Sequence, residues 1–161
     1  MPAQRVSVQT DDFDLSTEVA RLREHDGQIG AVVSFVGTVR EWLTPTQGAA
    51  ADSQACLELE HYPGMTESAI EAMIDEASRR FDLRGVRVIH RVGRLSVGEQ
   101  IVLVVTASSH RGQAFAACEF LMDWLKTQAP FWKKEISAQG ARWVDAKVSD
   151  DEALARWGNL P

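Results

Sequence analysis

The sequence contains few cysteines and none of the common nucleotide, metal or nucleophile signatures. Its 161 residues include only Cys56 and Cys118, which are too few and too far apart in the sequence to indicate a disulfide framework or a zinc site. It has no G-x-G-x-x-G, P-loop, H-E-x-x-H or G-x-S-x-G motif, each of which would mark a well-known class of enzyme. These absences remove several common enzyme classes.

Long apolar runs are also absent. The first ten residues, MPAQRVSVQT, lack the apolar core of a signal peptide, and no run approaches the length needed to span a membrane. We therefore expect a cytoplasmic protein. The net charge of −6 disfavours a general nucleic-acid-binding surface but is compatible with a local basic pocket. A chain of 161 residues with 45% hydrophobic residues is expected to form one domain with its own core.

Hydrophobic periodicity predicts an α+β protein with a mixed, largely antiparallel sheet and packed helices. Strands are predicted over residues 6–8, 29–39, 57–61, 86–92, 101–107, 131–135 and 141–148. Apolar residues at helical spacing predict helices after Ser16 and Thr66, each a candidate N-cap, and a central helix that ends at Lys126. A short C-terminal helix is expected from the capping-box pair Ser149 and Glu152.

Two segments are expected to depart from regular structure. Gly30 and Gly37 within the second strand indicate bends, bulges or close backbone approach. Residues 41–55 are rich in alanine, threonine, glycine, serine and proline and show no periodicity, so we expect a mobile loop there. Such a loop is either a lid over a site or a disordered connection.

Lysine is scarce, and three of the four lysines fall close together. Lys126 ends the central helix, Lys133 and Lys134 follow the break at Pro130, and only Lys147 lies apart. In an acidic chain this concentration of positive charge indicates a site for an anionic ligand.

Lys126 and Lys133 are the better candidates for chemistry because apolar or aromatic residues flank each of them. Nearby positive charge and partial burial lower the pKa of a lysine from about 10.4, in favourable cases toward roughly 7–8, where it transfers protons. Lys134 is expected on the opposite face of its strand from Lys133. The alternative explanation is structural: the lysine stems cover apolar surface while their charges stay in water.

Arg40, His110 and Arg111 also lie at the ends of predicted elements. Arginine offers a planar fork suited to phosphate, and His110 and Arg111 precede the central helix, whose free N–H groups attract anions. For each residue alone, solvated surface charge is an equally good explanation. Arg111 and Lys126 are 15 residues apart, so a continuous helix separates them by about 22 Å. If all these residues serve one reaction, a second copy of the chain supplies one end, and we predict a homodimer with a shared site.

The remaining candidates are weaker. Cys118 lies among apolar residues of the central helix and is expected to be a small buried hydrophobe rather than a nucleophile. His61 and His90 lie in strands and are expected to be structural, and the four histidines do not show metal-ligand spacing. The strand carboxylates, which are either acid–base groups or ordinary surface residues, are Glu58, Glu60 and Glu99.

Five segments of the chain match a known family in order and spacing. They are GAVVSFVGTVRE (30–41), LELEHYPGMTE (57–67), VIHRVGRLSVGE (88–99), SSHRGQAFAACEFLMDWLKTQAPFWKKE (108–135) and RWVDA (142–146). Over roughly residues 6–157 the chain resembles the large, catalytic subunit of molybdopterin synthase, the MoaE family. Several long segments in order are a more specific match than a single short motif.

The resemblance implies a function that composition does not show. Members of this family convert cyclic pyranopterin monophosphate into molybdopterin by installing the two sulfurs of its dithiolene, a step of molybdenum cofactor biosynthesis. The sulfur arrives as a thiocarboxylate on the C-terminal glycine of a small ubiquitin-like subunit. The family assembles as a heterotetramer, with a central homodimer of large subunits and one small subunit at each end. Its fold is α+β with an α/β-hammerhead portion, and the step needs no metal or organic cofactor.

The resemblance also implies roles for individual residues. Lys126 and Lys133 would be the catalytic lysines, and His110 and Arg111 would bind the phosphate or pterin from the neighbouring subunit. The residues implied in substrate binding are Thr38, Val39, Arg40, His110, Arg111, Lys126, Lys133, Lys134 and Glu135. Some relatives carry lysine at position 38, which leaves a direct contact between Thr38 and substrate open.

Two alternatives remain. A non-catalytic dimeric module that binds an anionic metabolite or a partner's C-terminal tail would not need reactive lysines. A nucleic-acid-binding domain is disfavoured by the net charge and by the absence of an RNP-type aromatic motif. Replacement of Lys126 or Lys133 separates the enzyme from the module, because only the enzyme loses turnover while it keeps binding.

Overall fold

The computed structural model describes residues 4–41, 55–138, 140–144, 148–158 and 160. Within these ranges the elements are β1 (Val6–Gln9), α1 (Leu15–Arg23), β2 (Ala31–Thr38), β3 (Cys56–His61), α2 (Met65–Arg80), β4 (Gly85–Arg91), β5 (Gly93–Ser96), β6 (Gln100–Ser108), α3 (Arg111–Thr127), β7 (Phe131–Ser137), β8 (Gly140–Trp143) and α4 (Val148–Ala155). Of the helices in these ranges, none has the length and apolar content needed to cross a membrane. The loop predicted over residues 41–55 lies outside the described residues, except for its first and last positions.

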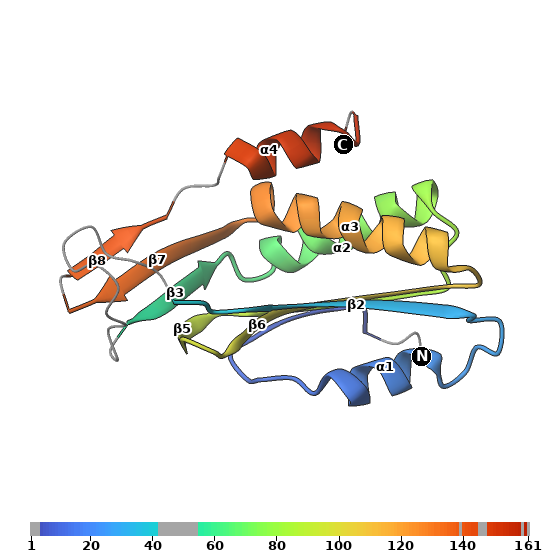
Figure 1. The fold of residues 1–161 in the computed structure, drawn as a ribbon, viewed down its shortest axis with the longest axis horizontal. Coiled ribbons are helices and arrows are strands. Elements are labelled where there is room, and N and C mark those ends of the chain that lie inside the picture. The colour runs from blue at the N-terminus through green and yellow to red at the C-terminus, as the bar shows by residue number, and fades with distance from the viewer. Residues whose placement is uncertain (1–3, 42–54, 139, 145–147, 159, 161) are drawn as a thin grey trace.

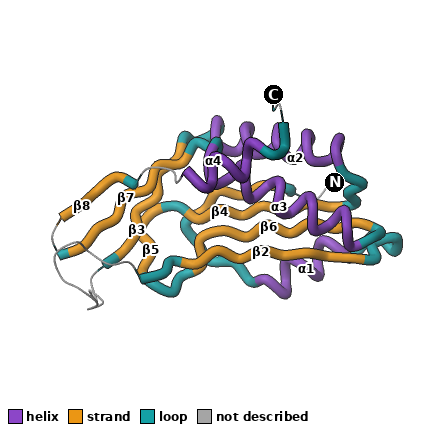
Figure 2. The backbone as a smooth tube through the Cα atoms, turned by 45° about the horizontal axis from the view of Figure 1, so that its top comes forward, coloured by secondary structure: helices purple, strands orange, loops and turns teal. Residues whose placement is uncertain are grey.

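The strands form two four-stranded sheets rather than one, and the predicted α+β class is confirmed. Sheet A has the order β1-β4-β6-β2 and sheet B the order β5-β3-β7-β8. Among the described strands, β1 and β4 pair in parallel and the other neighbours are antiparallel. Helices α2 and α3 cover one face of sheet A and α1 covers the other, while α4 lies over α3 (Figure 1). Sheet B continues from one end of sheet A (Figure 2).

Sheet A is buried on both faces. In β6, Val102 and Val104 pack with residues of α2 and α3, whereas Leu103 and Val105 pack toward α1. Because both faces are apolar, β6 has a continuous apolar sequence instead of an alternating one. On α3, Phe120 is fully buried in the first of these clusters. This packing fixes α3 on sheet A and so sets the position of both helix ends.

Sheet B has a smaller core, formed by Val39, Leu57, Leu59, Val92 and Leu95. The chain passes from β4 into β5 through Gly93, whose φ of +86° is a conformation that favours glycine. It also passes from α3 into β7, so the end of α3 and the start of β7 both lie where the two sheets meet (Figure 1).

The first helix starts earlier than predicted. Its N-cap is Asp14, whose carboxylate accepts a hydrogen bond from the Thr17 N–H at 2.8 Å. The expected cap, Ser16, lies inside the helix. The earlier start adds Leu15 to the apolar stripe that packs against sheet A.

The second helix also has a different cap. It begins at Met65 after Gly64, and Thr66 is fully buried instead of capping. The Thr66 hydroxyl accepts a hydrogen bond from the Tyr62 N–H at 3.0 Å and donates one to the Pro130 carbonyl at 3.1 Å. Thr66 therefore connects α2 to the segment between α3 and β7.

The remaining differences from the predicted elements concern an edge strand and the ends of strands and helices. The strand predicted over residues 29–39 exists as β2, but it is an edge strand and none of its side chains is buried. The register shifts between Gly37 and Thr38, which confirms the expected irregularity at Gly37. The last predicted strand is too long, because β8 ends at Trp143. Ser149, the predicted start of the last helix, lies within α4. The short β5 has no counterpart among the predicted strands.

Candidate functional site

Lys133 and Lys134 lie on opposite faces of β7, as predicted. In the antiparallel register, Lys133 is opposite Leu59 and Lys134 is opposite Glu58. Residues directly opposite each other share a face, and Leu59 is buried in the core of sheet B, so Lys133 belongs to the inner face. On the outer face, the Lys134 ammonium lies 4.6 Å from the centre of the Trp143 ring, a cation–π contact.

Lys126 lies in the last turn of α3 and its side chain is exposed. The connection from α3 to β7 is short, and it is anchored at two points. The Gln128 N–H donates to the Trp124 carbonyl at 2.8 Å, and the Pro130 carbonyl accepts from Thr66 of α2. The spacing between Lys126 and Lys133 is therefore set by backbone that is tied to its surroundings.

A buried histidine lies near both lysines. The ring of His90 in β4 stacks on Phe131 at the start of β7, with ring centres 3.8 Å apart. The pKa of His90 is lowered from 6.5 to about 4, mainly by burial and to a smaller extent by the charges of Lys126, His61 and Lys133, while the hydrogen bond with Arg91 opposes the shift. The Nδ1 atom of His90 lies 2.8 Å from the Arg91 carbonyl oxygen; because a carbonyl only accepts, Nδ1 carries the proton. The charges of Lys126 and Lys133 thus both favour the uncharged form of this ring.

This histidine predicts an acid sensitivity of the fold. His90 takes up a proton near pH 6.5 in the unfolded chain but only near pH 4 in the folded one, so its contribution to stability is complete above about pH 6.5 and is lost as the pH falls toward about 4. The loss is on the order of 2–3 kcal/mol. Urea denaturation of the parent protein and of His90→Phe, at several pH values from 7 to 4.5, measures it. Equal pH dependence of the unfolding free energy in the two proteins would contradict the prediction.

Thr38, Val39 and Arg40 lie at the end of β2 that adjoins sheet B. The Val39 side chain is only 2% exposed and packs in the core of sheet B. Its N–H donates to the Glu99 carbonyl at 2.9 Å, and its carbonyl accepts from the Gly98 N–H at 2.7 Å. The side chains of Thr38 and Arg40 are exposed. The geometry therefore makes Val39 an anchor between two side chains that are open to a ligand.

Glu135 is held in place by an arginine. It lies opposite Leu57 in the register and hence on the same face as Lys133. Its carboxylate accepts a hydrogen bond from the Arg142 guanidinium at 2.7 Å. This pair fixes a carboxylate two residues along β7 from Lys133.

His110 and Arg111 lie at the opposite end of α3 from Lys126. His110 is the N-cap residue, and its side chain, like that of Arg111, is exposed. The His110 side chain makes no capping hydrogen bond to the described part of α3, so the first N–H groups of this helix remain available to an anion. The 17-residue helix separates Arg111 from Lys126 by about 22 Å. One chain alone does not bring these two groups together.

The turn that carries His110 depends on a close backbone approach at Gly30. The Gly30 N–H donates to the Ser108 carbonyl at 3.0 Å, and a Cβ atom on residue 30 would lie 2.3 Å from the Ser109 carbonyl oxygen. Gly30→Ala is expected to lower the unfolding free energy by about 1–3 kcal/mol, because the Ser109 backbone must move. Urea denaturation measures the change. Gly112→Ala is the control: a Cβ there meets nothing within 4 Å. An unchanged unfolding free energy in Gly30→Ala would contradict the prediction and show that the backbone of this turn moves without cost.

The other candidates have structural explanations. Cys118 is buried, as predicted, and burial raises the pKa of its thiol to about 11, which disfavours the reactive thiolate. The Glu99 carboxylate lies 3.4 Å from the Arg91 guanidinium. Within the described ranges, no three His, Cys, Asp or Glu side chains gather as metal ligands would.

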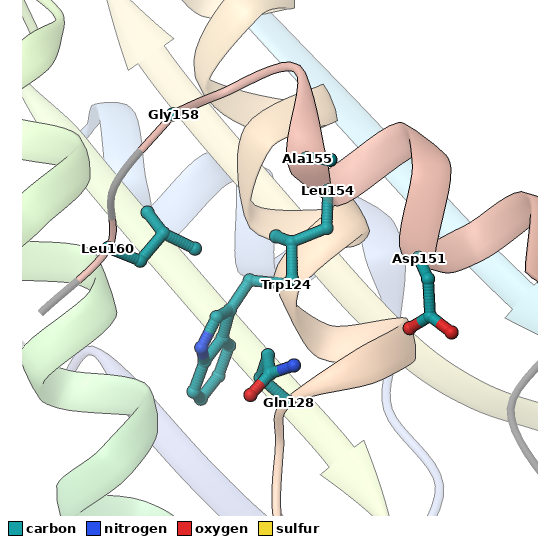
Figure 3. Close-up of a pocket in the computed structure, with 7 residues that line it drawn as sticks. All are labelled: Trp124, Gln128, Asp151, Leu154, Ala155, Gly158 and Leu160. Carbon is teal, nitrogen blue, oxygen red and sulfur yellow. The ribbon is translucent and has the colours of Figure 1, made fainter.

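A hollow of about 380 Å³ lies between α3 and α4 (Figure 3). It is lined by Trp124, Gln128, Asp151, Leu154, Ala155, Gly158 and Leu160. These residues include no cation, and Asp151 adds negative charge, so the hollow does not suit an anionic substrate. Lys126 lies about half a turn around α3 from both Trp124 and Gln128. The candidate site is therefore the lysine region and not this hollow.

Sequence reasoning missed the contact between His90 and Phe131. The two residues lie in different sheets and are 41 positions apart, so no local spacing links them. The sequence did contain one indication of this contact: a histidine lies within the apolar strand pattern of residues 86–92, and a buried polar ring needs a partner.

Comparison with known proteins gives a consistent result. The family model described as "MoaE protein" matches residues 8–128. A relative from Ralstonia nicotianae, named molybdopterin synthase catalytic subunit, is 59% identical over 153 residues, which cover 95% of this chain and 84% of the relative.

Solved structures are also similar. The molybdopterin biosynthesis MoaE protein from Burkholderia ambifaria superposes with a TM-score of 0.79 at 55% identity, covering 97% of this chain and 99% of that one. A chain from the Helicobacter pylori complex of subunits 1 and 2 of molybdopterin-converting factor superposes with a TM-score of 0.69 at 19% identity, covering 88% of this chain and 91% of that one. The second likeness is one of fold.

Proposed function

The chain belongs to the MoaE protein family, and from this membership we infer that it catalyses the molybdopterin synthase reaction of its relatives. In this reaction, sulfur from the thiocarboxylated C-terminus of a small ubiquitin-like subunit is transferred to cyclic pyranopterin monophosphate to make the molybdopterin dithiolene. The observation that carries the assignment to a site is the lysine pair. Lys126 ends α3 and Lys133 lies near the start of β7, and the short connection between them is anchored to α2. The charges of both also contribute to the lowered pKa of the buried His90.

The reaction needs positive charge and a proton donor. Sulfur must attack a carbon of the substrate, and an oxygen of the substrate must leave, which is easier when that oxygen is protonated. A lysine ammonium supplies the proton and stabilises the negative charge that develops during the attack. We assign these roles jointly to Lys126 and Lys133. Glu135, held by Arg142, lies on the same face of β7 as Lys133, whereas Lys134 lies on the opposite face against Trp143.

The substrate phosphate requires further cations. Arg40 lies at the end of β2 next to sheet B, and its exposed guanidinium suits a phosphate. Thr38 lies two residues earlier, and its side chain is also exposed. Val39 between them is fixed in the core and holds both in position.

A second copy of the chain supplies His110 and Arg111 in this proposal. Both residues lie about 22 Å from Lys126 along α3, too far to reach one small substrate in the same chain. The α3 N-terminus, with its free N–H groups, then binds the phosphate or pterin held by the lysines of the partner. This arrangement makes the homodimer the catalytic unit.

The edge of sheet A fits such a dimer. Strand β2 is an eight-residue edge strand, and Phe35 on β2 and Phe115 on α3 are 37% and 59% exposed. Long apolar edges of this kind are normally covered. Two copies joined antiparallel along β2 by a two-fold axis would also have antiparallel α3 helices. The His110 end of one α3 would then lie beside the Lys126 end of the other.

A small sulfur-carrier subunit completes the assembly. The family membership supports this partner, and the Helicobacter pylori complex contains two different subunits of a molybdopterin-converting factor. With two large and two small subunits, the assembly is a heterotetramer. We place it in the cytoplasm; both cysteines of this chain are unpaired, which suits a reducing compartment.

The test combines the purified protein, a thiocarboxylated small subunit and cyclic pyranopterin monophosphate, and measures dithiolene formation. Product is expected with the thiocarboxylate and none with a small subunit that ends in an ordinary carboxylate. If the two proteins form a complex and the substrate binds, yet no product appears, the chain is a binding module and the proposed activity is wrong.

A further inference from the structure

His90 connects the two sheets at the lysine site. It belongs to β4 of sheet A, and its ring stacks on Phe131 of β7 in sheet B, with ring centres 3.8 Å apart and planes 19° apart. Its Nδ1 donates to the Arg91 carbonyl oxygen at 2.8 Å, so the ring is also tied to its own strand. Together, the stack and the hydrogen bond fix the plane of a buried ring.

Phe131 in turn sets the position of Lys133. It is the first residue of β7, and Lys133 follows two positions later on the same face. His61 of β3 lies opposite Phe131, and Leu59 lies opposite Lys133. Two residues along a strand span only about 6.6 Å, so a shift or tilt of Phe131 passes directly to Lys133.

We propose that His90 is a positioning residue for Lys133: by stacking on Phe131 it holds the start of β7 against sheet A, which keeps the Lys133 ammonium where the reaction needs it. The proposal rests on the proposed function, because it concerns the same site. The stack on Phe131 carries the positioning, and the hydrogen bond to the Arg91 carbonyl adds stability to the ring. The uncharged ring also adds no third positive charge beside the two lysines.

Two substitutions separate the stack from the hydrogen bond. His90→Phe keeps a ring against Phe131 but loses the donor to the Arg91 carbonyl. His90→Asn places an amide nitrogen near the position of Nδ1 but removes the ring. In the complex with the thiocarboxylated small subunit, His90→Phe is expected to keep kcat within about threefold despite a lower Tm. His90→Asn is expected to lower kcat by about 10- to 100-fold with KM unchanged.

Coupling to Lys133 distinguishes positioning from general damage. If His90 acts through Lys133, adding His90→Asn to Lys133→Ala lowers kcat no further than Lys133→Ala alone. Additive losses, or losses in both His90 variants that follow their Tm values, would overturn the proposal.

A second readout does not depend on turnover. The chain has only four lysines, so the Cε signals of ¹³C-labelled lysine are few enough to assign. The Lys133 signal is expected to shift or broaden in His90→Asn and to stay near its parental position in His90→Phe. An unchanged Lys133 signal in His90→Asn overturns the inference even if the parent protein is active. A shifted signal supports it even if the proposed sulfur transfer fails.

Discussion

Lys133→Ala is expected to lower kcat for dithiolene formation by about 100- to 10,000-fold, the range lost with a group that transfers a proton and stabilises developing charge. Lys126→Ala is expected to give a loss of similar size. The charges of both lysines contribute to the lowered pKa of the buried His90, and the proposed function places both in one site. The stability of the fold should change little for Lys126, whose side chain is exposed. Steady-state assays on the complex with the thiocarboxylated subunit measure kcat and KM separately.

Lys133→Arg tests what the lysine contributes. Arginine keeps the positive charge but does not give up its proton near neutral pH. If the ammonium is a proton donor, Lys133→Arg restores substrate binding and leaves kcat low. If charge alone matters, kcat recovers as well.

Arg79→Ala is the matched control for the loss of a cation. Arg79 is exposed on α2 and bonded to Glu76 of the same helix, so its removal should leave kcat unchanged. Full activity in both lysine-to-alanine variants would remove the lysines from the mechanism and leave the family membership intact.

A dimer assembled from two inactive chains is expected to recover about half of the parental activity, because one of its two shared sites is then intact. One chain carries Lys126→Ala and the other Arg111→Ala, and different affinity tags allow the mixed dimer to be purified. The chain with Arg111→Ala supplies the lysines of the intact site, and the chain with Lys126→Ala supplies its arginine. Dithiolene formation by the mixed dimer is compared with that of each parent variant.

The reciprocal dimer is the control. It pairs a chain that carries both substitutions with a parental chain. If the sites are shared, each site has lost one group and the dimer is inactive; if each chain builds its own site, this dimer keeps half of the activity. The two models therefore predict opposite results for the two dimers. A mixed dimer as inactive as its parents would show that the 22 Å separation, about the length of α3, is not bridged by a second copy.

Patterns within one element predicted local structure well. The apolar run in residues 101–107 predicts β6, and the two faces of that strand are both buried. The placement of Lys133 and Lys134 on opposite faces follows from strand geometry alone, and the register confirms it. The length of α3 follows from its apolar spacing, and this length is the reason to expect a shared site.

Contacts between elements that are far apart in the sequence could not be predicted from the sequence. Ser16 and Asp14 are equally good caps by residue type, and only the packing of Leu15 against sheet A decides between them. Thr66 has the residue type of a cap, but its hydroxyl is bonded to Pro130 in another part of the chain. The stacking of His90 on Phe131 joins two sheets, and its effect on Lys133 appears only in three dimensions.

The core of sheet A is larger than that of sheet B, so the two sheets are expected to differ in their stability against local unfolding. Strand β6 is covered on both faces and paired on both edges, so we expect its amides to exchange with solvent only when the whole protein unfolds. Sheet B rests on a cluster of five buried residues, and it carries β7 with Lys133. We therefore expect sheet B to open as a local unit at lower free energy while sheet A stays folded. Lys133 therefore lies on the sheet that is expected to open more easily, whereas α3 is packed on the sheet that stays folded.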